Sequence, residues 1–215
     1  MPGMTKVHPS ISAAITASSS AEKLKSSANL DSDAVVLTVW KKSLLFNCNG
    51  FTVYDRSGNL VFRVDNYMTC SGSKGEILLM DAGGEPLLTI RRKKLSLADS
   101  WLVYDGETAV NPLLSVRKHV NILNSKCLAH VSSGRNGSRN IVYEIEGSYS
   151  QRNCVVYDEK RRKVAEVKRK EAVGGVAFGV DVFRLVVGAN MDKSVAMAIV
   201  ILLDQMFGSS KRISN

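Results

Sequence analysis

The chain has 215 residues, of which 45% are hydrophobic, and a net charge of +9 from 29 Lys and Arg against 20 Asp and Glu. This length and apolar content allow a full hydrophobic core, exclude a wholly disordered chain, and favour one domain over two. The positive charge indicates an anionic partner, either a membrane surface or nucleic acid, although many basic proteins bind neither.

Residues 1–30 are predicted to form a flexible tail. They are rich in serine and alanine and contain few large apolar residues, so burial cannot repay the entropy of ordering them. No charged segment followed by an apolar one begins the chain, so no signal peptide is predicted, and the lack of arginine disfavours a transit peptide. We therefore expect a cytoplasmic protein, peripheral at the plasma membrane or nuclear in the alternatives.

From Val35 onward one unit recurs: an apolar run, a turn that contains Asp, and a second apolar run. Asp can bond to backbone groups two residues further on, and Gly supplies a positive φ, so such turns reverse the chain. Each copy is therefore predicted to be a β-hairpin. The four turns begin at Asp55, Asp81, Asp105 and Asp158.

Further strand-like runs lie at residues 35–40, 127–131, 141–145 and 181–187, which brings the expected total to about twelve strands. No segment with helical periodicity lies between them that is long enough for a crossover. The pattern therefore predicts an antiparallel up-and-down sheet rather than β-α-β units.

One strong helix is predicted, at residues 191–207, near the C-terminus. Val195 to Leu203 is an unbroken apolar run, Asn190 and Asp192 are candidate N-caps, and Gly208 fits a left-handed C-terminal stop. A helix without a polar face must be surrounded by apolar surface, but this run is well short of the roughly 20 residues that a bilayer requires. At about 1.5 Å per residue the helix would be roughly 26 Å long, close to the height of a β-barrel.

These observations predict a mainly β fold: a closed antiparallel barrel of about twelve strands around a buried C-terminal hydrophobic helix. Barrels of about eight strands are filled by their own side chains, whereas an eleven-stranded barrel has room for a central helix. We expect the barrel domain to span residues 31–208, followed by a short basic tail at 209–215.

The residues in these segments are similar to the plant LURP-one-related family. The similarity lies in Ser43 to Asp55 (SLLFNCNGFTVYD), Gly58 to Tyr67 (GNLVFRVDNY), Ile77 to Asp81, Leu87 to Lys94, Trp101, and the stretch from Phe183 to Asp192. It extends from about Val35 to Phe207. The resemblance implies the fold of tubby C-terminal domains and phospholipid scramblases, a twelve-stranded barrel around a C-terminal helix. It also implies a link to plant defence and, by analogy of fold, a membrane-tethered regulator of transcription.

The sequence offers little reactive chemistry, and no catalytic residue, metal site or cofactor is predicted. His8, His119 and His130 are far apart in the chain, and we interpret them as isolated. The four cysteines contain no C-x-x-C pair, and we expect them to be reduced and mostly buried. A glycine-rich stretch that ends at Gly179 is followed by Val180 where a phosphate loop needs lysine. We therefore expect a binding module and not an enzyme.

Clusters of basic residues are the remaining candidates for a binding site. The predicted ligands of an anionic head group are Arg91, Arg92, Lys93, Lys94, Lys168, Arg169 and Lys170. These two clusters and Arg117-Lys118 follow the second strands of hairpins and could gather at one rim of a barrel, whereas residues 160–163 lie in a turn. In the alternative interpretation all are solvated strand ends and turns that deter aggregation.

Four functions remain open at this level, of which an enzyme or small-ligand carrier that uses a cavity in the barrel is disfavoured because the helix would fill the lumen. The favoured one is binding to anionic membrane lipid such as a phosphoinositide. DNA binding is less favoured, because groove readout needs a helix or a β-ribbon and the only predicted helix is in the core. Scramblase-like activity is also disfavoured, because Asp204 and Gln205 interrupt the apolar helix.

Overall fold

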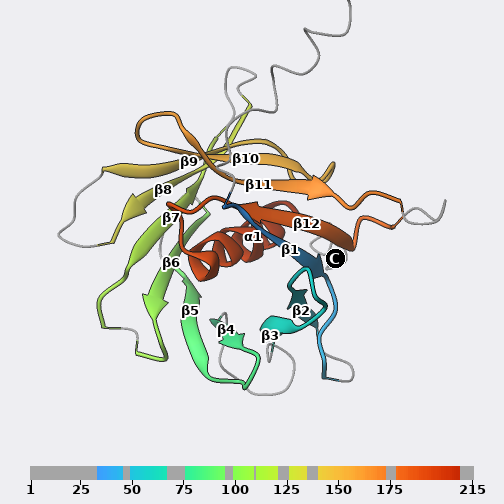
Figure 1. Ribbon diagram of the computed structural model, residues 1–215. Helices are drawn as coiled ribbons and strands as arrows, with labels where there is room; N and C mark the ends of the chain where they lie inside the picture. Colours follow the sequence, from blue (N-terminus) through green and yellow to red (C-terminus); the bar gives the residue numbers. More distant parts are fainter. Residues whose placement is uncertain are drawn as a thin grey trace, which may run out of the picture.

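The computed structural model describes residues 33–45, 49–66, 76–94, 99–108, 110–120, 126–134, 140–172 and 178–208, which form one closed β-barrel around one helix (Figure 1). The strands are β1 (Val35–Trp40), β2 (Asn49–Tyr54), β3 (Leu60–Asn66), β4 (Glu76–Asp81), β5 (Pro86–Arg92), β6 (Ser100–Asp105), β7 (Leu114–Lys118), β8 (Cys127–Ser133), β9 (Ile141–Ser148), β10 (Asn153–Asp158), β11 (Lys163–Arg169) and β12 (Val182–Val187), followed by α1 (Lys193–Phe207). The predicted fold class is confirmed. The predicted tails at residues 1–30 and 209–215 lie outside the described residues.

Every strand pairs antiparallel with its neighbours in the chain, and β1 closes the barrel by pairing with β12. This is the predicted up-and-down order, and closure leaves no edge strand among the twelve. Strands with odd numbers therefore all end at one end of the barrel, and strands with even numbers all end at the other.

The predicted hairpin turns form in the expected way. The Asp55 carboxylate accepts hydrogen bonds from the backbone N–H groups of Ser57 and Asn59, both at 2.8 Å, and Gly58 has a φ of +86°. Asp158 accepts from the N–H groups of residues 160 and 162 in the same manner. All four predicted Asp turns lie at the same end of the barrel, which we call the hairpin-turn rim.

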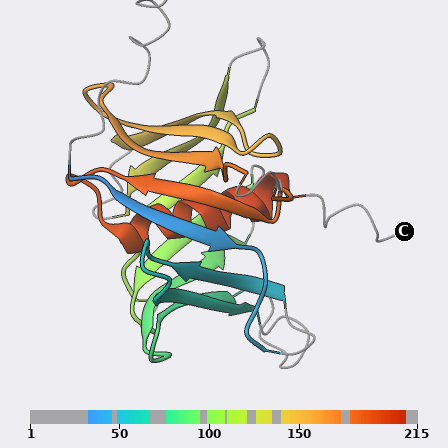
Figure 2. The ribbon, with the colours of Figure 1, turned by 45° about the vertical axis from the view of Figure 1, so that its right-hand side comes forward.

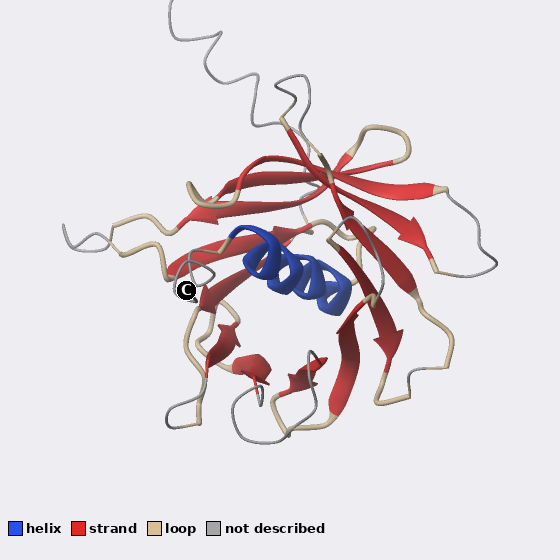
Figure 3. Cartoon of the chain, turned by 180° about the vertical axis from the view of Figure 1, so that it is seen from behind, coloured by secondary structure: helices blue, strands red, loops and turns tan. Residues whose placement is uncertain are grey.

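Helix α1 lies inside the barrel, as Figure 3 shows from behind. Its buried residues occupy every side: Ala196, Met197, Ala198, Ile199, Val200, Ile201, Leu202, Leu203 and Met206. Alternate residues of the strands point at it; on β12 these are Phe183, Leu185 and Val187, each 1% exposed or less. The predicted all-apolar helix is therefore the centre of the core.

The ends of α1 differ in part from expectation. Asp192 is the N-cap and accepts hydrogen bonds from the N–H groups of Ser194 and Val195, at 2.8 and 3.0 Å. Gly208 ends the helix as expected, but its φ of −66° and ψ of 145° are extended. The prediction of a left-handed stop is wrong, because the N–H of Gly208 already bonds to the Asp204 carbonyl and no Schellman reversal is needed.

The chain enters α1 from the hairpin-turn rim and leaves it at the opposite end, where β1 also ends (Figure 2). We call that opposite end the basic rim. It comprises the ends of β1, β3, β5, β7, β9 and β11, the starts of the strands that follow them, and the described parts of their connections.

We expect Leu202→Asp to prevent folding. Leu202 is 1% exposed at the centre of the barrel, and an unpaired buried charge costs at least 3 to 5 kcal/mol, roughly half the stability of a typical domain. The measurement is the yield of soluble protein and its circular dichroism. Lys193→Asp, in the exposed first turn of the same helix, should fold normally, and a soluble Leu202→Asp protein with an unchanged melting temperature would contradict a core role for α1.

Candidate anion-binding rim

The structure places the predicted basic ligands at one end of the barrel. Residues 91–94 lie at the end of β5 and just beyond it, and residues 168–170 lie at the end of β11. Both strands have odd numbers and end at the basic rim, where Arg117 and Lys118 of β7 also lie. Residues 160–163 belong to the β10–β11 turn at the opposite end.

The two predicted clusters do not form one pocket. In the closed strand order, five strands separate β5 from β11 in either direction, so the clusters face each other across the mouth of the barrel. At about 4.8 Å per strand, the mouth is roughly 20 Å wide. One head group cannot contact both clusters, but a flat anionic surface can.

Several of these cations are already engaged within the protein. Arg91 binds Glu76 at 2.8 Å, Arg92 binds Asp99, and Lys168 binds the buried Glu166. Arg169 donates to the side chain and the backbone of Gln151. By contrast, Lys93 and Lys94 are exposed and have no ion-pair partner within the described ranges. Of the predicted set, Lys93 and Lys94 are therefore the most available to a ligand, whereas Lys170 is half-buried and donates to the Thr38 hydroxyl.

Two lysines at this rim lie over aromatic rings. The Lys42 ammonium is 5.0 Å from the centroid of the Trp40 ring, and Lys170 is 5.2 Å from that of Phe178. Both rings are 40% exposed. The pairs are close neighbours, because Trp40 is opposite Val182 in the β1–β12 register and Lys170 reaches Thr38 of β1. Cations and exposed aromatic rings thus alternate over the β11–β12–β1 sector.

Most exposed large apolar side chains of the described residues stand at the basic rim. They are Trp40, Leu44, Leu45, Val120, Phe178 and Val180, whereas Val35, Val110 and Ile141 are at the hairpin-turn rim. Leu44 and Leu45 are held there by Ser43, whose hydroxyl donates to the buried Asp65 carboxylate at 2.5 Å. The basic rim therefore combines positive charge with exposed apolar surface.

The C-terminal end of α1 is fixed inside the basic rim by residues of the barrel wall. Asp204 pairs with Lys41 at 2.9 Å and accepts a hydrogen bond from the Tyr149 hydroxyl at 3.2 Å. Lys118 donates to the Met206 carbonyl at 3.2 Å and lies over Phe207. Burial, together with the Asp204 charge, raises the pKa of Tyr149 far above its usual value, so its hydroxyl remains a donor.

Arg152 closes the wall beside this end of the helix. Its guanidinium lies 4.1 Å from the Tyr149 ring centroid and 4.4 Å from that of Phe183, and its Nε donates to the Val180 carbonyl at 2.8 Å. The residue is 6% exposed. Arg152 therefore supports the rim from within and is not available to a ligand on the surface.

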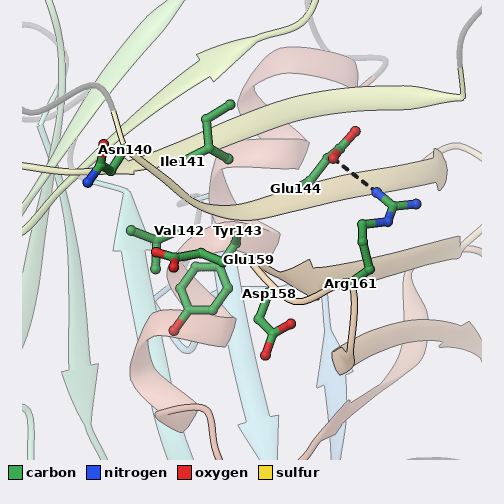
Figure 4. A pocket seen from close by; sticks show the side chains of 8 residues that line it. All are labelled: Asn140, Ile141, Val142, Tyr143, Glu144, Asp158, Glu159 and Arg161. Atoms are coloured by element: carbon green, nitrogen blue, oxygen red, sulfur yellow. Dashed lines mark hydrogen bonds and ion pairs between the residues drawn. The ribbon is translucent and has the colours of Figure 1, made fainter.

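A surface groove of about 380 Å³ lies on the outer wall beside β9 and the β10–β11 turn (Figure 4). Its lining residues are Asn140, Ile141, Val142, Tyr143, Glu144, Asp158, Glu159 and Arg161. Arg161 donates to Glu144 at 3.0 Å and to Glu146 at 2.8 Å. Carboxylates outnumber cations here, so the groove does not favour an anionic ligand.

The prediction that the histidines are isolated is wrong for His119 and His130. Their ring centroids are 5.2 Å apart, and the Cys127 sulfur lies 3.5 Å from Nε2 of His130. Burial, followed by the charges of Glu144 and Glu146, raises the pKa of the Cys127 thiol to about 11. A nucleophilic cysteine needs a lowered pKa, so this arrangement does not favour nucleophilic catalysis.

The prediction of reduced and buried cysteines is confirmed for Cys127 and Cys154. The other two, Cys48 and Cys70, lie outside the described residues, as do residues 174–177 of the glycine-rich stretch 174–179. No helix in the described part of the chain is long and apolar enough to cross a membrane.

Comparison with known proteins agrees with this architecture. A family model described as LURP-one-related matches residues 35–204, the barrel and most of α1. The chain belongs to the LURP-one-related family. It is 56% identical over 211 residues to Protein LURP-one-related 8 of Arabidopsis thaliana, covering 96% of this chain and all of that protein. Protein LURP-one-related 17 of the same plant is 45% identical over 194 residues, covering 84% of this chain and 86% of that protein.

A solved structure shows the same fold. The X-ray structure of an Arabidopsis thaliana protein matches with a TM-score of 0.59 at 25% identity, over 80% of this chain and 91% of the other. The family and the barrel that the sequence resemblance implied are therefore both confirmed. The family name states no catalytic activity, ligand or partner.

Sequence reasoning missed the apolar part of the rim. Trp40 is the last residue of β1, and Phe178 and Val180 precede β12, so each reads as an ordinary strand-flanking residue. An aromatic residue next to lysine at a strand end, as in Trp40-Lys-Lys42, was the available signal. That signal indicates a surface patch only when β1 and β12 are known to be neighbouring strands.

We expect Asp204→Ala to destabilise the protein by about 1 to 3 kcal/mol, because the buried Tyr149 hydroxyl loses its acceptor. Urea denaturation measures the loss. Tyr149→Phe in the Asp204→Ala background should recover about 1 kcal/mol. Glu171→Ala is the control, because that carboxylate is 81% exposed and its removal should change little. Equal losses in the single and double variants would show that Tyr149 and Asp204 are not coupled.

Proposed function

We propose that this protein is a non-enzymatic module that docks on anionic membrane surfaces, with phosphoinositides as the favoured lipids, through its basic rim. One observation carries the proposal: exposed apolar side chains and available cations occupy the same end of the barrel. Attraction to the membrane would then have two sources that act on one surface.

The apolar contribution comes from residues suited to a membrane interface. Trp40 and Phe178 are each 40% exposed, and Val180 beside them is 54% exposed. Aromatic side chains are enriched at the level of lipid head groups, where the ring is buried and its edge remains hydrated. The Trp40 ring, with Lys42 above it, would enter the interface while the ammonium meets lipid phosphate.

The electrostatic contribution comes from cations that form no ion pair with an acid in the described part of the chain. Lys93 and Lys94 are exposed beyond the end of β5, Arg117 is exposed on β7, and Lys42 follows β1. They lie on or just after β1, β5 and β7 at one end of the barrel, so a flat surface can meet all of them together. Each basic residue near an anionic leaflet contributes about 1 kcal/mol.

The described residues of the opposite end do not form such a surface. Its turns mix Asp55, Asp81, Asp105 and Asp158 with Arg and Lys, and Arg162 pairs with Asp158 at 2.7 Å. A barrel with one basic rim and one rim of mixed charge is oriented by an anionic surface. Orientation would leave the hairpin-turn rim facing the solution, where a further partner could bind.

DNA is also polyanionic, but the described structure supports it less. Helix α1 is buried in the barrel, so no described helix can enter a groove. The role in defence or transcription that the family resemblance implied would follow from membrane docking only if release from the membrane were regulated. It stays a prediction.

We expect the full-length protein to sediment with vesicles that contain phosphoinositide at about 0.1 M salt, where exposed charges still attract. Lys93→Gln with Lys94→Gln should weaken binding about 30-fold, from about 1 kcal/mol per charge. Lys160→Gln with Lys193→Gln removes equal charge from the opposite rim and should have little effect. Trp40→Ser should also weaken binding, without changing the net charge.

Three comparisons can contradict the proposal. Equal loss in the two double-glutamine variants would mean that net charge, and not the basic rim, governs binding. Equal binding to neutral phosphatidylcholine vesicles would exclude an electrostatic role. Phosphatidylserine vesicles matched for charge test the lipid class, and tighter binding to duplex DNA than to any vesicle would favour a nucleic-acid partner.

A further inference from the structure

Three metal-binding side chains converge on the outer wall of the barrel near the basic rim. His119 follows β7, Cys127 is the first residue of β8, and His130 is the fourth. One potential ligand atom from each lies within 4.8 Å of the other two. Cys127 is buried and both histidines are half-buried, so the cluster is held by the wall and is accessible from one side.

A β-bulge brings Cys127 and His130 to the same face. Residues three apart in a regular strand point to opposite sides of a sheet. Here the register shifts between Cys127 and Ala129, so that Cys127 is opposite Glu146 and His130 is opposite Glu144. The extra residue of this bulge turns the Cys127 side chain back to the outer face of the barrel wall. His119 joins them because its N–H bonds to the Leu128 carbonyl at 2.8 Å.

The ligand set and its spacing suit zinc. Two imidazoles and one thiolate are common zinc ligands, and Zn–S and Zn–N bonds of about 2.3 and 2.05 Å place tetrahedral S and N atoms roughly 3.6 Å apart. The distance between the Cys127 sulfur and His130 Nε2 is 3.5 Å. The sulfur and this nitrogen therefore already have the spacing of two ligands in a tetrahedral zinc site. A change in the conformation of the His119 side chain would add the third ligand.

Glu144 is the proposed fourth ligand, and its side chain would have to move toward the cluster, because among the described residues only His119, Cys127 and His130 have ligand atoms within 4.8 Å of one another. It is opposite His130 in the register of β8 and β9. Arg161 holds the carboxylates of Glu144 and Glu146 at 3.0 and 2.8 Å and lies over the Tyr157 ring. Such outer partners orient ligating carboxylates in metal sites. Arg117, the basic neighbour opposite His130, is exposed and can turn to solvent.

We propose that His119, Cys127 and His130 form a binding site for Zn²⁺, with Glu144 as the fourth ligand. The site would tie the segment after β7 to β8 and β9 on the outside of the wall. Its ligands are not among the residues of the proposed membrane docking, although Arg117, which is opposite His130, is one of the docking cations.

Equilibrium dialysis of the full chain against Zn²⁺ tests the site, after chelator treatment and in a background with Cys48→Ser and Cys70→Ser. We expect one zinc per chain. Cys127→Ser, His119→Gln and His130→Gln should each weaken binding by at least about 100-fold, and Glu144→Gln by about 10-fold. Cys154→Ala is the matched control, because Cys154 lies in the hydrophobic core, and it should bind zinc like the parent.

Two further readouts identify the ligands. Co²⁺ in place of Zn²⁺ should give the thiolate-to-metal charge-transfer band and the visible bands of a tetrahedral site, and Cys127→Ser should lose the charge-transfer band. In the unmodified chain, Zn²⁺ should protect Cys127 from alkylation, measured by mass spectrometry for each cysteine; this does not depend on any variant folding. Absence of the charge-transfer band, or alkylation of Cys127 unchanged by zinc, would overturn the proposal.

Discussion

Helix α1 is apolar on every side, and this constraint determines most of the structure. A helix without a polar face is stable in water only if apolar surface surrounds it completely. A closed wall of twelve strands provides that surface. The wall in turn is too wide to be filled by its own side chains, as an eight-stranded barrel is. Helix and barrel therefore each supply what the other lacks, and neither is expected to persist alone.

Because the helix is buried, residues at the end of the barrel must supply partners for its terminal backbone groups. The last carbonyl groups of α1 carry partial negative charge and lack partners within the helix. The last turn contains no basic residue, so Lys118 of β7 donates to the Met206 carbonyl, and Lys41, which follows β1, pairs with the Asp204 side chain. Part of the positive charge at the basic rim is thus explained by the needs of the fold.

The other cations of the basic rim do not hold the helix. The basic residues of this rim therefore fall into two sets. Lys41, Lys118 and Arg152 point inward and hold the end of the helix or the wall beside it. Lys42, Lys93 and Lys94 point outward into solvent. Exposed cations alone often serve only solubility. Their position beside Trp40 and Phe178, which are costly to expose, is what favours a partner at this rim.

Local sequence patterns determined the architecture of this protein. Asp55, Asp81 and Asp158 form their turns with hydrogen bonds inside a few residues, and the apolar run from Val195 to Leu203 excludes a surface position for the helix. Both signals are short-range, so they could be interpreted without coordinates. The resemblance to the LURP-one-related family rested on the same segments.

Only the tertiary structure decided which chemically active residues meet. The clusters at 91–94 and 168–170 share a rim because β5 and β11 run in the same direction, yet closure places them on opposite sides of it. Cys127 and His130 face the same way only through a β-bulge, and His119 reaches them from the segment that follows β7. Strand direction, closure and bulges depend on pairing between distant segments, and a single residue of register change reverses the face of a side chain. The sequence by itself therefore determined the barrel and its core helix, while long-range pairing decided the composition of its surface sites.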